Sequence, residues 1–261
     1  APVKSGRQGN VYMYKGIPHY LIDEASPRVQ YSVTRFQKKA REEIVNILQR
    51  GKVPIICGGT GHWIDAVIFD QTFPNIKADT ALRSKLAKLT TEQLFSKLQK
   101  LDPARAASID SKNPRRLVRA LEIVISSGKP VPEHASKLNK NFPAYANVKI
   151  KWFGLNPDMA ILETKIAKRL KGWLKSGLVQ EVKKLRDPKT GSGLSWKRIE
   201  SFGLEYKFCA QYLQGKISKE EMENLSYTSI RQYAKRQMTW WKRNENIKWY
   251  KDYEKVLKNF S

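Results

Sequence analysis

The sequence is short of cysteine, histidine, acidic side chains and long apolar runs, and each shortage excludes a class of protein. Its 261 residues include two cysteines and three histidines, which are too few for a disulfide framework and lack the spacing of a structural zinc site. No run approaches the roughly 18 apolar residues that span a bilayer. We therefore expect a soluble protein of the reducing cytoplasm.

Acidic residues are outnumbered by basic ones, 24 against 49, which leaves a formal net charge of +25. The surplus extends over both halves of the chain, so it is not a detachable basic tail. A folded, uniformly basic protein points to a polyanionic partner, with nucleic acid first and a membrane surface second. A peripheral membrane protein is the weaker alternative, because the aromatic residues fall mostly in stripes typical of a core.

The N-terminal half begins with the pattern of an α/β unit. Residues 34–50 repeat apolar side chains at helical spacing and end before Gly51, which predicts a helix. The run VPIICGGTG at 53–61 is typical of a buried parallel strand that ends in a glycine-rich loop. The first eighteen residues contain no convincing strand, whereas VKIKWFGLN at 148–156 is a second strand candidate.

Helical patterns dominate the rest of the chain. Residues 79–127 contain successive helices with Thr, Asp-Pro and Asn-Pro start signals, and 128–147 reads as a loop. Another helix follows Pro157, and a last long one begins at Ser218 with a capping box to Glu221. Its predicted buried face is Tyr227, Ile230, Ala234, Met238 and Trp241. We predict an α/β core, residues 1–78 and 148–261, with an all-helical insertion, residues 79–147.

The loop Gly58-Gly59-Thr60-Gly61 follows the first predicted strand. In α/β folds ligands bind at the carboxyl ends of strands, so these amides and the Thr60 hydroxyl could approach a substrate closely. The chain contains no GxxxxGK[ST] motif, so this loop is not a phosphate-binding P-loop. A turn that simply requires positive φ explains the glycines equally well.

Arginines occupy the start of the helix that Asn113 and Pro114 begin. Arg115, Arg116 and Arg119 oppose the helix dipole there by roughly 0.3–1 kcal/mol each, so local stability does not explain them. Three guanidiniums beside free helix amides would suit a phosphate backbone. The alternative is a solvated basic face above a core of apolar residues.

Two other groups of cations are less specific. In the last helix, acidic residues come first and Arg231, Lys235 and Arg236 follow, an order that helix stability alone accounts for. Arg169 lies about 60° from the apolar stripe of its helix, at the border of the buried face. Its anionic partner is equally well a structural carboxylate or a ligand phosphate.

Seven segments occur together in the order of one family. They are GIPHYLID (16–23), YSVTRFQ (31–37), PIICGGTGHWIDAV (54–67), LDPARAASID…NPRRLVRALE (101–122), RLKGWLKSGLVQEVKKL (169–185), FGLEYK (202–207) and RQYAKRQMTWWKR (231–243). The chain thereby resembles the tRNA dimethylallyltransferase (tRNA isopentenyltransferase) family from about residue 16 to its end.

The resemblance implies an activity and a site. Enzymes of this family transfer a dimethylallyl group from its diphosphate to N6 of adenosine 37 in the tRNA anticodon stem-loop, with Mg²⁺, on a P-loop-NTPase-like parallel-sheet core with a helical insertion. The chemistry requires a base taken out of the stack and cationic stabilisation of the leaving diphosphate. We also expect a monomer.

Residue by residue, the resemblance assigns these roles to matching positions. Thr60 would contact the flipped adenosine, and Arg169 would hold the diphosphate. The remaining matches concern tRNA: Arg83; Arg115, Arg116, Leu117, Val118 and Arg119; and Glu200, Ser201, Phe202, Gly203, Leu204 and Glu205. Arg231, Lys235 and Arg236 are additional candidates.

The N-terminal motifs of the family have no match in this sequence. These are a GPTxSGKT-type P-loop and a DSxQxY segment with the proposed general-base Asp, whereas the first Asp here is Asp23. We therefore assign no catalytic residue and no protein ligand to a metal. Roughly 40 residues of the family pattern are expected to be missing. The chain as given is predicted to bind tRNA without transferring prenyl groups, and the alternative is a noncatalytic RNA-binding protein of the same fold.

Overall fold

A computed structural model describes residues 7–8, 11–69, 71, 73–74, 76, 78–132, 148–189 and 191–258. The chain forms two compact units: Ala1–Ile64 together with Ala144–Ser261, and Asp65–Pro143. We call them the split unit and the helical unit and describe each by itself. The predicted domain boundaries at residues 78 and 148 stay a prediction.

A small antiparallel sheet opens the split unit. Strands β1 (Arg7–Gln8), β2 (Val11–Tyr14) and β3 (Ile17–His19) pair in order, with Tyr12 opposite His19. The two-residue turn has positive φ at Lys15 (50°) and Gly16 (74°), as tight hairpins require. The expectation of no strand in the first eighteen residues was therefore wrong, because the strands are very short and a lysine occupies a position that usually signals itself by Asn, Asp or Gly.

The second sheet is parallel. It pairs β4 (Trp152–Leu155) with β5 (Ile247–Tyr250), which confirms the strand predicted within 148–156. The buried strand predicted at 53–57 is wrong: this run is not a strand, and Val53 and Ile55 are 80% and 71% exposed. A parallel strand is held by hydrogen-bonded neighbours, and no strand in the described part of the chain pairs with this run. The described fold is thus mostly helical, with one small antiparallel and one small parallel sheet.

Helix α1 (Val33–Gln49) confirms the first predicted helix. The Ser32 hydroxyl accepts a hydrogen bond from the Arg35 amide at its start, and Gly51 follows its end at φ 65°, where glycine is favoured. Ala40 and Ile44 are buried. Helix α2 (Gly61–Ile68) then begins directly after Thr60.

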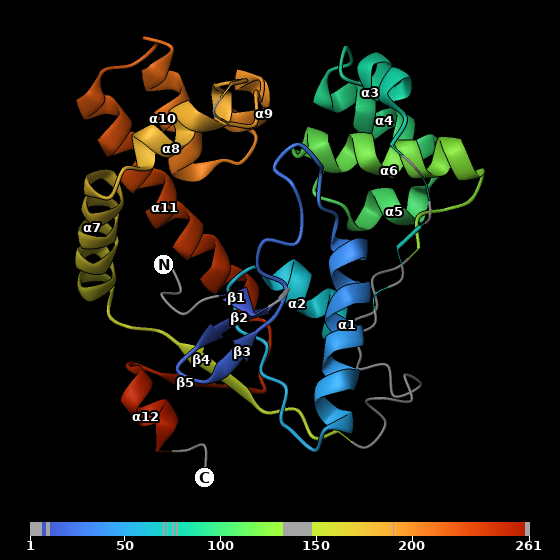
Figure 1. Ribbon diagram of the computed structural model, residues 1–261. Coiled ribbons are helices and arrows are strands. Elements are labelled where there is room, and N and C mark those ends of the chain that lie inside the picture. The colour runs from blue at the N-terminus through green and yellow to red at the C-terminus, as the bar shows by residue number, and fades with distance from the viewer. Residues whose placement is uncertain are drawn as a thin grey trace. The chain divides into compact units, whose positions relative to one another are not determined.

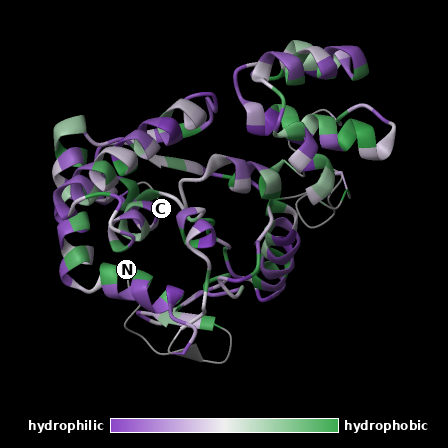
Figure 2. Ribbon diagram, turned by 90° about the horizontal axis from the view of Figure 1, so that it is seen from above, coloured by the Kyte–Doolittle hydropathy of each residue, from purple (hydrophilic) through white to green (hydrophobic). Residues whose placement is uncertain are grey.

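Six further helices complete the split unit (Figure 1): α7 (Met159–Lys175), α8 (Leu178–Arg186), α9 (Trp196–Glu200), α10 (Leu204–Leu213), α11 (Lys219–Trp241) and α12 (Tyr253–Leu257). Their common core contains Val182, Ile199, Cys209 and Met222. The capping box of Ser218 and Glu221 is confirmed. The residues predicted to form the buried face of α11 are only half-buried. The buried residues of this helix are instead Met222 and Ser226. Figure 2 shows both hydrophilic and hydrophobic residues on the helices of the chain.

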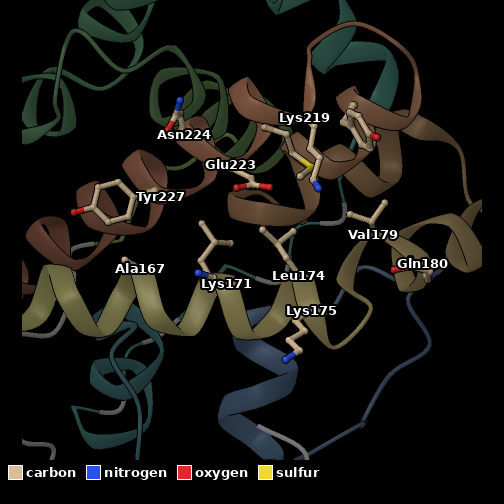
Figure 3. Close-up of a pocket in the computed structure, with 13 residues that line it drawn as sticks. Ala167, Lys171, Leu174, Lys175, Val179, Gln180, Lys219, Glu223, Asn224 and Tyr227 are labelled. Atoms are coloured by element: carbon tan, nitrogen blue, oxygen red, sulfur yellow. The ribbon is translucent and has the colours of Figure 1, made fainter.

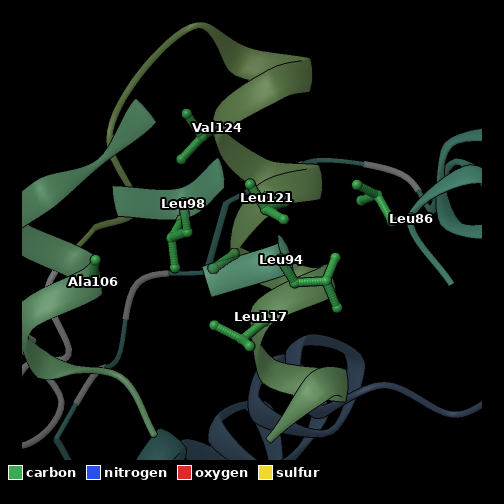
Figure 4. Packing of buried hydrophobic residues seen from close by; sticks show 8 residues of the cluster. Leu86, Leu94, Leu98, Ala106, Leu117, Leu121 and Val124 are labelled. Carbon is green, nitrogen blue, oxygen red and sulfur yellow. The ribbon is translucent and has the colours of Figure 1, made fainter. Parts of the chain in front are cut away.

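The helical unit contains α3 (Thr80–Leu86), α4 (Thr91–Leu101), α5 (Pro103–Ser108) and α6 (Pro114–Ser127). Side chains of Thr90, Asp102 and Asn113 cap α4, α5 and α6, which confirms the predicted start signals, and Asp79 caps α3. Leucines from α3, α4 and α6 meet in the core that Figure 4 shows. Of the predicted loop 128–147, residues 133–147 lie outside the described residues.

Candidate functional site

The glycine-rich loop lies against the C-terminal half of α11. The Thr60 hydroxyl and the Tyr233 hydroxyl are 2.7 Å apart, within hydrogen-bond distance. The Trp241 indole N–H donates to the Gly59 carbonyl at 3.1 Å. The loop and the RQYAKRQMTWWKR segment are far apart in the sequence, but these hydrogen bonds show that they are in contact in the fold. Thr60 itself remains exposed.

Close packing, rather than backbone conformation, explains two of these glycines. A Cβ on Gly59 would lie well inside van der Waals contact with the Gln237 amide, and one on Gly61 would overlap the Trp240 ring. Gly58, Gly59 and Gly61 all lie outside the positive-φ region. The alternative explanation by positive φ was therefore wrong, since it is the approach of α11 that leaves no room for a side chain.

Cations stack on the aromatic side chains of this part of α11. The Arg236 guanidinium lies 5.7 Å from the Tyr233 ring centroid, and that of Arg243 lies 4.3 Å from the Trp240 centroid. Such contacts hold the cation while leaving its edge open to an anion. Arg243 was missed by sequence reasoning, although the run of two tryptophans before two cations is a signal for it.

The additional candidates on α11 differ from one another. Arg231 donates to Glu163 on α7 at 2.5 Å, so it joins two helices. Lys235 is exposed and lies one turn from Arg231. Arg231 is therefore best explained by structure, whereas Lys235 and Arg236 face solvent.

Arg169 stands on the exposed side of α7. Its guanidinium lies 5.9 Å from the Trp173 ring centroid. Among the described residues no carboxylate lies within ion-pair distance of it. The structural carboxylate that the sequence left open is absent there, and the side chain is available to an anion.

A buried carboxylate organises the predicted tRNA arginines of the helical unit. Glu122 on α6 is fully buried, and its Oε1 accepts from Arg83 Nε and from the Asp79 amide, each at 2.8 Å. Its Oε2 accepts from Arg83 Nη2 at 2.8 Å and from Arg119 Nη1 at 2.5 Å. Burial alone would raise the pKa of Glu122, but these hydrogen bonds outweigh it and hold the pKa below its ordinary value.

The residues predicted to contact RNA at the N-terminus of α6 are of two kinds, exposed arginines and apolar residues that pack in the core. Arg115 and Arg116 are exposed, next to the Asn113 side chain that caps the helix by accepting from the Arg116 amide. Leu117 is fully buried and Val118 packs against the same core. Helical spacing turns the Leu117 side chain inward, so the prediction that Leu117 contacts tRNA stays a prediction about its backbone.

Residues 200–205 form the turn between α9 and α10. Gly203 and Leu204 have positive φ, 78° and 44°. The Phe202 ring lies under the Arg198 guanidinium at 4.9 Å, and Glu200 accepts from the Gln214 amide at 2.8 Å. Ser201 and Phe202 are exposed, so the tip of this turn faces solvent.

The structure also contains a cleft that sequence reasoning missed. It measures about 800 Å³ and lies between α7, α8 and α11, with Leu174, Val179 and Tyr227 among its lining (Figure 3). Lys171, Lys175 and Lys219 line it as well, with Glu223 as the one acidic lining residue. None of the predicted site residues lines this cleft.

The described residues hold no group of three His, Cys, Asp or Glu side chains that would bind a metal ion. Within the same residues, no helix is both long enough and apolar enough to cross a membrane. The predicted site residues fall into two sets. Arg83 and Arg115–Arg119 belong to the helical unit, and Thr60, Arg169, residues 200–205 and the α11 cations belong to the split unit.

Comparisons with known proteins agree on one family. The sequence model described as IPP transferase matches residues 9–244. A tRNA dimethylallyltransferase from Carboxydothermus hydrogenoformans is 38% identical, over 90% of this chain and 75% of that protein. One from Acetivibrio thermocellus is 37% identical, over 94% and 79%.

Two solved structures are similar as well. The full-length tRNA isopentenylpyrophosphate transferase from Bacillus halodurans has a TM-score of 0.60 and 32% identity, and the match covers 94% of this chain and 76% of that one. A eukaryotic dimethylallyltransferase acting on tRNA has a TM-score of 0.65 and 24% identity, over 87% and 56%. The second likeness concerns the fold alone.

Proposed function

The chain belongs to the IPP transferase family of tRNA dimethylallyltransferases, and on this premise we propose that it serves the transfer of a dimethylallyl group from dimethylallyl diphosphate to N6 of adenosine 37 in tRNA. The partners are the anticodon stem-loop and the diphosphate. The protein acts as a monomer in the cytoplasm. Its small parallel sheet belongs to a P-loop-type core.

The observation that carries this proposal is the set of cations without a carboxylate partner. Arg115 and Arg116 lie exposed at the start of α6, where the helix dipole disfavours cations. An anion at that point pairs with both arginines and is favoured by the positive end of the helix dipole. A tRNA phosphate backbone is such an anion, and phosphate contacts of this kind set the position of a nucleic acid on a protein.

The split unit contains the residues that we assign to the nucleobase and to the leaving diphosphate. Thr60 and Tyr233 present two hydroxyls beside the stacked Arg236, an arrangement that hydrogen-bonds the edge of a nucleobase taken out of its stack. Arg169 has its guanidinium free for the leaving diphosphate. Residues 200–205 offer an exposed aromatic ring, Phe202, for stacking against RNA.

No protein ligand is assigned to the expected Mg²⁺. The described residues contain no group of three His, Cys, Asp or Glu side chains, and magnesium is usually held by one or two carboxylates together with substrate phosphates and water. We therefore derive no step through a metal ion. What the described residues do is bind, orient and neutralise the RNA and the diphosphate.

Equilibrium binding of an unmodified anticodon stem-loop tests the proposal. The logarithm of the affinity should fall linearly with the logarithm of salt concentration, and Arg115→Ala with Arg116→Ala should flatten that slope by about 0.9 for each lost phosphate contact. Lys97→Ala, an exposed cation on α4, is the matched control. A wild-type protein that does not bind the stem-loop would contradict the proposal, and an unchanged slope in the double variant would remove these arginines from the interface.

A substitution in the RNA tests the base-reading side. A stem-loop with guanosine in place of adenosine 37 should bind more weakly to the wild type, because the exocyclic N6 amine is missing. The Tyr233→Phe variant should lose most of this difference. Equal affinity of the wild type for both stem-loops would contradict adenosine recognition beside Thr60.

A further inference from the structure

Glu122 is an unusual residue for the middle of an apolar helix face. It follows Leu121 and precedes Ile123, both buried, and it is fully buried itself. An ionised carboxylate in such a place requires partners that compensate for the lost water. Its partners are two arginines from different helices, Arg83 of α3 and Arg119 of α6, together with the Asp79 amide.

The two arginines are not buried with it. Their side chains are 40% and 39% exposed, against 0% for Glu122. Arg83 uses Nε and Nη2 toward Glu122, and Arg119 uses Nη1 while its Nη2 reaches the Ile76 carbonyl at 3.5 Å. A guanidinium has five N–H donors in one plane, so each arginine keeps donors that Glu122 does not occupy, on a part of the side chain that solvent reaches.

The charges of this group do not balance. Two cations share one anion, and both guanidiniums contact the same carboxylate, so they are held close to each other despite their repulsion. A second anion on the outer side would complete the arrangement. A phosphate has the oxygens to accept from both planar forks at once.

We propose that Glu122 is a positioning residue for RNA: its buried carboxylate fixes Arg83 and Arg119 side by side, so that their outer N–H groups together bind one phosphate. This inference rests on the proposed function. It changes how the two arginines act, because each is now a preorganised donor rather than a mobile surface charge, and preorganisation lowers the entropy cost of binding.

The direction in which Glu122→Gln changes RNA affinity distinguishes a positioning role of Glu122 from a purely electrostatic one. Replacing Glu122 by Gln removes a negative charge, so electrostatics alone would strengthen the binding of a polyanion. If Glu122 positions the arginines, the anticodon stem-loop should instead bind about tenfold more weakly, the scale of one charge-assisted hydrogen bond. Glu92→Gln removes an equally negative but exposed side chain of α4 and should leave the affinity unchanged or slightly raised.

A double-mutant cycle locates the effect. In a protein that carries Arg83→Ala and Arg119→Ala, Glu122→Gln should no longer weaken binding, because nothing remains to be positioned. Binding is measured with the full chain, and circular dichroism verifies that each variant is folded at the assay temperature.

Two conservative variants cover the case in which the Glu122 variant unfolds. Arg83→Lys and Arg119→Lys keep the charge but remove the planar fork, so each should weaken binding about three- to tenfold with an unchanged salt slope. The inference would be overturned if the Glu122→Gln variant bound the stem-loop as tightly as the wild type, or if both lysine variants did. Failure of the wild type to bind the stem-loop would instead contradict the proposed function.

Discussion

Replacing Gly61 by alanine should destabilise the split unit, although alanine is the better helix former. Gly61 is the first residue of α2, and a Cβ there would overlap the Trp240 ring. That ring is itself held by the His62 edge contact and by Arg243, so it has little freedom to move. Overpacking costs about 1–3 kcal/mol and the gain in helix propensity is at most about 1 kcal/mol, so even after the full gain is subtracted the net loss reaches about 2 kcal/mol.

Gly172 provides the matched control. It lies close to the C-terminal end of α7, in the same unit, with no atom within 4 Å of an added Cβ. Gly172→Ala should therefore stabilise by about 0.5–1 kcal/mol through helix propensity alone. The same substitution at two helical glycines is thus expected to act in opposite directions.

Thermal unfolding followed by tryptophan fluorescence measures both variants. For a chain of this size, 1 kcal/mol corresponds to about 2–4 °C in Tm, so the two variants should differ by several degrees. Because the chain has two units, the transition of the split unit must be separated from that of the helical unit. A Gly61→Ala protein as stable as Gly172→Ala would refute the packing of α11 on the loop.

Three further predictions follow from individual contacts. Glu122→Gln should cost about 3 kcal/mol, the low end for a broken buried pair because both arginines are partly exposed. Since the folded pKa of Glu122 is lowered, the stability it contributes is fully present above about pH 4.5 and is lost as pH falls through the folded pKa. Urea unfolding of variant and wild type should therefore converge in acid. Burial raises the pKa of Cys209 to about 11, so a thiol reagent at neutral pH should label the exposed Cys57 alone until the protein unfolds. Thr60→Val and Tyr233→Phe should show a coupling of about 0.5–1.5 kcal/mol in a double-mutant cycle of stability, and additive effects would contradict their hydrogen bond.

Helix boundaries were predictable because they are decided within a few residues. The side chains of Thr90, Asp102, Asn113 and Ser218 each accept from the amide three positions along the chain, so these caps are decided by neighbours in the sequence. The same locality explains why the end of α1 before Gly51 was found. The family itself was recognisable because its motifs keep their order along the chain.

Features that depend on distant neighbours were not predictable in the same way. The run at 53–57 has the composition of a buried strand, yet strand formation depends on a partner that composition does not reveal. The glycines of the loop look like turn residues until Gln237 and Trp240 are seen against them. Glu122 carried one usable signal, since a lone Glu on a face with Leu117 and Leu121 requires a buried counter-charge.

The net charge of +25 gives the excess of basic over acidic residues but does not say which basic side chains already have partners within the protein. The structure identifies several that do. Arg231 pairs with Glu163, Arg198 donates to the Pro27 and Val29 carbonyls, and Arg83 and Arg119 share Glu122. These side chains hold the protein together before they meet any partner. The salt dependence of RNA binding reports only phosphates that are neutralised on binding. The slope of affinity against salt should therefore reflect only the few basic residues that contact phosphates, and not the net charge of the chain. The clearest candidates for such contacts lie on α6.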